Sequence, residues 1–167
     1  MTNNDLLIRL RYALDIKDTD MVKIFNLGGV DLDKDDVRKI LVKRSEEDKI
    51  FQDADTADDF KTCNDKMLDG FLNGFVTFKR GPREGSAPAP QPTKKDHPNN
   101  LFLKKVKVAL SLTTDDLIEI FKLADADVSK SELSAIFRKP DHRHYRQCLD
   151  RDIRRFLTGL TAKYREN

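Results

Sequence analysis

The sequence predicts an all-α protein built from two homologous four-helix units in tandem, pseudo-two-fold related and joined by a Pro-rich linker. The first observation is an internal repeat, because at an offset of 96 residues 13 of the 41 positions from 3 to 43 are identical. The ends of the two copies align at an offset of 85, from Phe60 with Tyr145 to Gly74 with Gly159. The second observation is that apolar residues recur at helical spacing in both copies, whereas no segment is typical of a strand. We therefore divide the chain into a first unit (1–80), a linker (81–98) and a second unit (99–167).

The first two helices of each unit follow from periodicity and end signals. Apolar residues at 6, 7, 10, 13 and 14, and again at 102, 103, 106, 109 and 110, fall on one face of an α-helix. The second helix is predicted to begin at an N-cap, Asp18 in the first unit and Thr114 in the second. In the first unit it ends at Gly28-Gly29, since a glycine readily adopts the left-handed conformation that terminates a helix.

The third and fourth helices carry capping and apolar signals. Ser129-Lys130-Ser131-Glu132 predicts a capping box, Asp33 to Asp36 occupies the same place in the first unit, and Pro140 closes the third helix of the second unit. The fourth helix carries the apolar residues Cys63, Met67, Leu68, Phe71, Leu72 and Phe75, echoed by Cys148, Ile153, Phe156, Leu157 and Leu160. The change of offset places 11 extra residues before the fourth helix of the first unit. The repeated glycines of this helix, Gly74 and Gly159, predict the close approach of another helix backbone, because a mid-helix glycine is otherwise costly.

The segment between the units, residues 81–98, holds five of the six prolines of the chain. This composition favours an extended spacer, and the alternative is a ligand for a proline-reading partner. Because each unit is small, it buries little surface alone. We therefore expect the two units to pack face to face as an internal pseudo-dimer.

Several motifs together resemble those of one protein family. They are the duplication itself, Phe-Leu-x-Gly in both fourth helices, Lys79-Arg80-Gly81 leading into Ser86-Ala87-Pro88, Ala109-Leu110-Ser111-Leu112 with Asp115-Asp116, and Pro140-Asp141-His142 before Cys148. In these motifs, and over essentially its whole length, the chain resembles the bacterial YehS-like family. The resemblance implies a two-copy, mostly helical, cytoplasmic protein. It implies no activity and supplies no catalytic or binding residues, since the family is one of unknown function.

Composition narrows the class of protein further. The 167 residues are 36% charged, and no apolar run approaches the length of a membrane span. The first residues lack the basic and then apolar pattern of a secretory signal, so we expect a soluble cytoplasmic protein with no membrane partner. Two cysteines cannot build a disulfide scaffold or a four-thiolate zinc site.

Candidate metal and catalytic groups have simpler structural explanations. The acids Asp31, Asp33 and Asp35 have calcium-loop spacing, but Asp36 and Val42 stand where such a loop requires Gly and Glu. We therefore interpret these acids as a turn followed by a helix N-terminus. Cys63 and Cys148 share one register, which favours two buried thiols on an apolar helical face over a metal cluster with His142 and His144.

The common phosphate-binding, serine-nucleophile and zinc-protease motifs are absent from the sequence. We therefore expect no catalytic residues, no cofactor, no metal and no enzymatic activity. An enzyme of unrecognised type would need a pocket with converging titratable groups.

Charge is distributed unevenly between the units. The first unit carries a net charge of −3, the linker +1 and the second unit +4. The excess gathers at seven predicted phosphate contacts: Arg138, Lys139, Arg143, Arg146, Arg151, Arg154 and Arg155. If the apolar residues of the last helix face inward, Arg151, Arg154 and Arg155 face outward, where arginine binds phosphate oxygens well. A solvated charged face is the simpler interpretation of this patch.

The sequence leaves two functions in competition. The first is a non-enzymatic interaction module that binds an unidentified protein or a protein–nucleic acid assembly. The second is direct binding of DNA or RNA phosphates through the basic face of the second unit. The second and third helices of each unit resemble a helix–turn–helix, but Asp33 to Asp36 of the first unit would repel DNA phosphates. The sequence predicts no oligomeric state.

Overall fold

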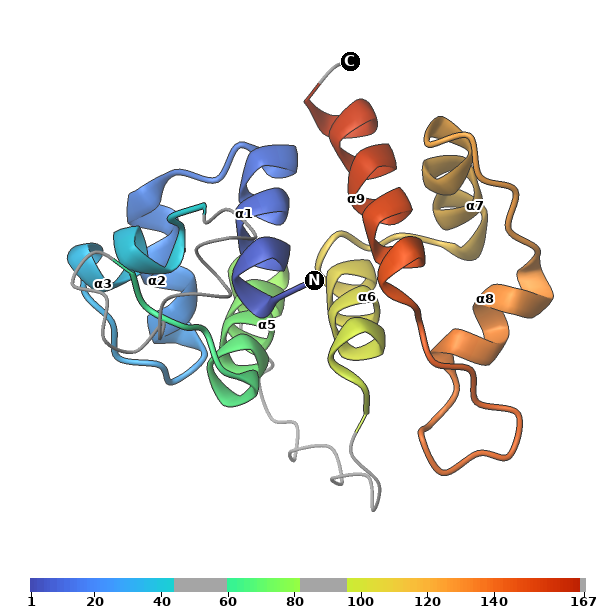
Figure 1. The fold of residues 1–167 in the computed structure, drawn as a ribbon, viewed down its shortest axis with the longest axis horizontal. Coiled ribbons are helices and arrows are strands. Elements are labelled where there is room, and N and C mark those ends of the chain that lie inside the picture. Colours follow the sequence, from blue (N-terminus) through green and yellow to red (C-terminus); the bar gives the residue numbers. More distant parts are fainter. Residues whose placement is uncertain (44–59, 82–95, 166–167) are drawn as a thin grey trace, which may run out of the picture.

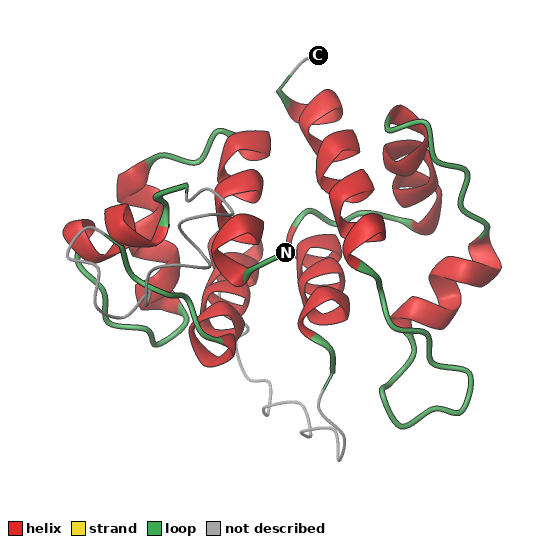
Figure 2. Cartoon of the chain, viewed as in Figure 1, coloured by secondary structure: helices red, strands yellow, loops and turns green. Residues whose placement is uncertain are grey.

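The computed structural model describes residues 1–43, 60–81 and 96–165, and these residues form eight α-helices and no strand (Figure 2). The first half contains α1 (Asn3–Leu14), α2 (Asp18–Leu27), α3 (Lys34–Ile40) and α5 (Asp65–Arg80). The second half contains α6 (Pro98–Ala109), α7 (Thr114–Leu123), α8 (Lys130–Phe137) and α9 (Asp150–Tyr164). The predicted all-α class is confirmed. Most of the predicted linker and of the 11-residue insertion lies outside the described residues.

Helix ends agree with the sequence at α3, agree in part at α8 and differ at two other helices. At α8 Ser129 accepts from the Glu132 N–H, which is one half of the predicted capping box. Asp33 caps α3, with its carboxylate accepting from the Asp36 N–H and the Asp36 carboxylate accepting from the Asp33 N–H. The predicted N-caps of α2 and α7 were wrong by one residue, since Lys17 and Thr113 occupy those positions. At α7 the capping box identifies the N-cap, because Thr113 exchanges hydrogen bonds with Asp116 three residues later.

The apolar residues of all eight helices form a continuous core, in which Phe25 and Phe121 are fully buried. The two mid-helix glycines lie where helices almost touch. A Cβ atom on Gly74 would lie 1.9 Å from the carbonyl oxygen of Ile24, and one on Gly159 would lie 1.8 Å from that of Ile120. The predicted close approach of a second helix backbone is therefore confirmed for α2 with α5 and for α7 with α9.

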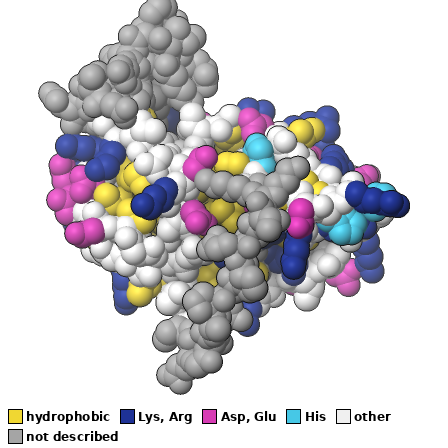
Figure 3. Space-filling view, turned by 90° about the horizontal axis from the view of Figure 1, so that it is seen from below, with side chains coloured by type: hydrophobic (Ala, Val, Ile, Leu, Met, Phe, Trp, Pro, Cys, Tyr) yellow, Lys and Arg dark blue, Asp and Glu magenta, His cyan; other side chains and the backbone are white. Residues whose placement is uncertain are grey.

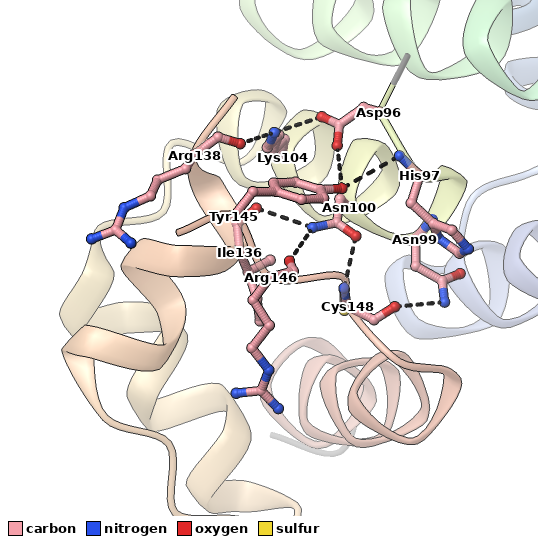
Figure 4. Close-up of polar contacts among 10 residues, drawn as sticks. All are labelled: Asp96, His97, Asn99, Asn100, Lys104, Ile136, Arg138, Tyr145, Arg146 and Cys148. Carbon is pink, nitrogen blue, oxygen red and sulfur yellow. Dashed lines mark hydrogen bonds and ion pairs between the residues drawn. The ribbon is translucent and has the colours of Figure 1, made fainter. Parts of the chain in front are cut away.

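A buried asparagine in each half holds the segment that precedes the last helix. The side-chain amide of Asn4 donates to the carbonyls of Ile40 and Lys61, and its oxygen accepts from the Cys63 N–H. Asn100 makes the same three bonds to Ile136, Arg146 and Cys148 (Figure 4). Cys63 and Cys148 therefore lie in an extended segment before α5 and α9, which corrects the prediction that they belong to those helices.

The two halves meet through their first and last helices. Helix α5 packs against α6, and α1 packs against α9, so these four helices occupy the centre with α2 and α3 on one side and α7 and α8 on the other (Figure 1). Arg80 at the end of α5 donates to the carbonyl of Val108 on α6 at 3.3 Å. Arg165, 85 positions later, donates to the carbonyl of Tyr12 on α1 at 2.9 Å. Each half thus uses the same end of its last helix to contact the first helix of the other half.

Candidate nucleic-acid interface

Three of the predicted phosphate contacts lie on the outer face of α9. Arg151, Arg154 and Arg155 are exposed, as the helical spacing predicts, because Ile153, Phe156 and Leu157 turn into the core. None of the three arginines forms an ion pair with another residue in the described part of the chain. Hydrogen bonds from the N-terminal ammonium and from Asn99, and to a smaller degree the positive charge of Arg154, lower the pKa of Asp150. Arg154 is therefore compensated in part, whereas the charges of Arg151 and Arg155 are available to an external anion.

Arg9 of α1 extends this face across the boundary between the halves. Its guanidinium donates to the Thr158 hydroxyl at 3.0 Å and to the carbonyl of Arg154 at 3.5 Å. Burial and then the positive charge of Arg154 lower the pKa of Arg9, whereas Asp5 opposes this shift. We call Arg9, Arg151, Arg154 and Arg155 the α9 arginine surface. The sequence prediction did not include Arg9, because it considered only the basic residues of the second half and Arg9 belongs to the first.

The other four predicted contacts lie on or beside the loop between α8 and α9. Arg138 donates to the carbonyl of His144 at 3.1 Å, and Arg143 Nε donates to the imidazole Nε2 of the same histidine at 3.0 Å. Lys139 is exposed. Arg146 differs, since it lies 4.0 Å from the Glu132 carboxylate and 3.9 Å from that of Asp152, which partly neutralise it. Basic and histidine side chains gather at the right-hand end of the face in Figure 3.

A buried network and a partly buried one fix the shape of this loop (Figure 4). Asn100 binds it at Arg146 and Cys148. The Tyr145 hydroxyl donates to Asp96 at 2.7 Å, and the other oxygen of Asp96 accepts from Lys104, which also donates to the Arg138 carbonyl at 2.8 Å. Burial, followed by the hydrogen bond to Asp96, raises the pKa of Tyr145 well above its usual value. The loop arginines therefore project from a backbone that is held in place.

A groove runs between α6 and α8 beside the start of α7. It has a volume of about 480 Å³ and is lined by Lys104, Lys107, Val108, Thr114, Lys130, Leu133, Ser134, Phe137 and Arg138. Four of these nine side chains are basic and none is acidic. Only Arg138 among the seven predicted contacts reaches it, so the predicted residues are not brought together into one site.

The cysteines show no sign of reactivity. Cys63 and Cys148 are free and buried, and burial raises the pKa of each thiol to about 12. The prediction of two buried thiols is confirmed, and His142 and His144 are exposed. Within residues 1–43, 60–81 and 96–165, no three His, Cys, Asp or Glu side chains are grouped so that they could hold a metal ion. No helix in the same part of the chain is long and apolar enough to cross a membrane.

Comparison with known proteins gives the family of the chain. Residues 3–81 and 99–166 match the family described as "Protein of unknown function (DUF1456)". The chain belongs to this family. It is also 39% identical over 163 residues to "Uncharacterized protein YehS" of Escherichia coli (strain K12), which covers 98% of this chain and 96% of that protein. The resemblance seen in the sequence motifs is therefore confirmed. No solved structure matches the chain.

Proposed function

We propose that this DUF1456 protein is a non-enzymatic interaction module that engages a protein–nucleic acid assembly, with the α9 arginine surface contacting nucleic-acid phosphates. The observation that carries this proposal is the exposure of Arg151, Arg154 and Arg155 on one helix face without an ion-pair partner among the described residues. Arginine forks hold phosphate oxygens in pairs, and neutralising several phosphates releases counterions, which drives binding.

The first half does not repeat this surface. The positions that correspond to Arg151, Arg154 and Arg155 hold Lys66, Asp69 and Gly70. Packing explains Gly70, because a Cβ atom there would collide with the Val30 side chain. Packing does not explain why an aspartate stands at position 69 where the second half has Arg154. The difference favours a contact that only the second half makes.

We propose further that the two halves are copies of one four-helix unit related by a pseudo-two-fold axis. Support comes from the matching bonds of Asn4 and Asn100 and from the crossed contacts of Arg80 and Arg165. Reciprocal contacts of this kind are the mark of an isologous interface. Expression of residues 1–80 alone tests this arrangement, since a monomeric fragment of full stability would contradict the mutual burial it requires.

Two further predictions from the sequence belong with this proposal. We propose a cytoplasmic location, and we propose that residues 81–98 act as a spacer between the halves.

Fluorescence anisotropy with labelled single-stranded and duplex oligonucleotides tests the nucleic-acid contact. We expect affinity to fall steeply with salt, and the triple change Arg151→Glu, Arg154→Glu and Arg155→Glu to abolish binding. With glutamine at the same positions, the slope of log K against log salt is expected to become shallower by about 0.7–0.9 for each phosphate contact removed.

The matched control is Lys66→Glu, which reverses a charge at the corresponding place on α5 and should leave binding intact. Affinity that does not change with salt, or equal losses in the triple variant and in Lys66→Glu, would refute the contact. If partners from a lysate remain bound after nuclease treatment and also bind the triple variant, the chain recognises a protein without nucleic acid.

A further inference from the structure

The groove between α6 and α8 differs from the corresponding place in the first half at the residues that set its charge. Arg11, which corresponds to Lys107, is bound by the carboxylate of Asp18 at 2.5 Å. In the second half the position of Asp18 is taken by Thr114, so no acid occupies that place. The positions of Lys104 and Arg138 hold Ile8 and Val42 in the first half. The second half therefore gains two cations here and loses one anion.

The four cations of the groove differ in how far neighbouring groups compensate their charges. Lys104 is held by Asp96 and by the Arg138 carbonyl. Lys130 lies 3.6 Å from Asp115, but both side chains are largely exposed, so this pair is weak. Lys107 and Arg138 form no ion pair with any other described residue, and the Lys107 ammonium lies 5.7 Å from the centre of the Phe137 ring. The Arg138 guanidinium also donates to the carbonyl of His144 at 3.1 Å, which leaves it charged but partly engaged. Lys107 and Arg138, from α6 and from the end of α8, therefore line the groove without a carboxylate partner among the described residues.

We propose that this groove is a binding site for a ligand that carries two or more linked phosphate groups. Cations from α6, α8 and the end of α8 surround it, and the Ser134 hydroxyl lies among them as a neutral donor. Lysine and arginine are the side chains that bind phosphate, and arginine adds a planar pair of donors.

The size and lining of the groove favour such a ligand over a small single anion. A volume of about 480 Å³ lies in the range of small-molecule sites, and cations spread over several elements match a chain of charges better than one carboxylate. Leu133, Val108 and Phe137 add an apolar floor on which an organic group attached to the phosphates can lie. A nucleotide and a nucleic-acid backbone share this chemistry.

Isothermal titration calorimetry with inorganic pyrophosphate, at constant ionic strength, tests the site on the full chain. We expect saturable one-to-one binding that is weakened about ten- to hundredfold by Lys107→Gln, because a charge-assisted hydrogen bond is lost. Thr114→Asp should weaken it at least as much, since it introduces the acid that Asp18 supplies in the first half. An acid at the first position of α7 favours the helix dipole, so this variant should keep the thermal stability of the wild type.

The matched control is Lys34→Gln, which removes the lysine at the position corresponding to Lys130 but outside the groove. It should bind pyrophosphate as the wild type does, whereas Lys130→Gln should bind more weakly. Absence of saturable binding, or equal weakening in Lys34→Gln, would overturn the proposal.

Competition identifies the source of the phosphates. Displacement of pyrophosphate by ATP but not by a short oligonucleotide would assign the site to a small nucleotide-like ligand, and the reverse would assign it to a nucleic-acid backbone. Arg151, Arg154 and Arg155 do not line the groove. Their triple change is therefore expected to leave pyrophosphate binding intact. The groove proposal and the proposed nucleic-acid contact of the α9 arginine surface can thus fail independently of each other.

Discussion

Replacement of Asn100 by alanine should destabilise the protein by about 3 kcal/mol, because three hydrogen bonds in a buried site contribute about 1 kcal/mol each. The Asn100 side chain is completely buried and spans three backbone groups, at 3.1 Å from Ile136, 2.9 Å from Arg146 and 2.7 Å from Cys148. Alanine cannot reach these groups. The Cys148 N–H would then be buried without an acceptor. Such a donor costs more free energy than one that forms a hydrogen bond with water.

Urea denaturation followed by circular dichroism measures this loss as a shift of the midpoint at constant slope. Asn73→Ala is the matched control, since Asn73 is exposed on α5 and its side chain forms no hydrogen bond with another described residue. It should leave stability nearly unchanged or raise it slightly through helix propensity. Asn4→Ala should resemble Asn100→Ala, because Asn4 makes the corresponding bonds. A loss below about 1 kcal/mol at Asn100 would refute the reasoning, since it would equal a single exposed hydrogen bond.

Three other predictions follow from packing and from the pKa shifts. Gly74→Ala and Gly159→Ala should each destabilise by about 2 kcal/mol in chemical denaturation, because the added methyl collides with a backbone carbonyl, and an unchanged or raised midpoint would contradict the close approach. At pH 8 a thiol of pKa about 12 is ionised in about one molecule in ten thousand, so Cys63 and Cys148 should react with Ellman's reagent only when urea is added, and rapid reaction of the native protein would show that they are accessible. The pKa of Tyr145 is raised by folding, so its contribution to stability is complete below the unfolded value of about 10 and is lost as pH rises above it. Tyr145→Phe should therefore flatten the fall of the thermal midpoint above about pH 10, and an identical fall in both proteins would exclude Tyr145 as its cause.

Local signals in the sequence predict the helices well and their ends less well. Apolar spacing alone locates α1, α2, α6 and α7, and it places Arg151, Arg154 and Arg155 on the solvent side. Thr113 and Thr114 are equally suitable caps by composition, and only the bond to Asp116 distinguishes them.

Long-range features could not be predicted from the sequence in the same way. Cys63 and Cys148 are apolar enough to count as helix residues, yet asparagine side chains 59 and 48 residues earlier in the chain hold them in extended segments. The groove was missed because its four cations come from positions 104 to 138 and no two are adjacent. The sequence contains one sign of the groove, which is that Thr114 stands where the first copy has Asp18. This difference can be interpreted only once the structure shows that Asp18 forms an ion pair with Arg11.

The crossed packing of α5 on α6 and of α1 on α9 has a practical consequence for the architecture. The helices that join the two halves all lie outside the peptide that connects Gly81 to Asp96. A bacterium that makes residues 1–81 and 96–167 as separate polypeptides should therefore recover the assembled protein, with each fragment completing the other. Such complementation would make the two fragments a heterodimerisation tag, because two proteins fused to them would be brought together whenever the halves associate.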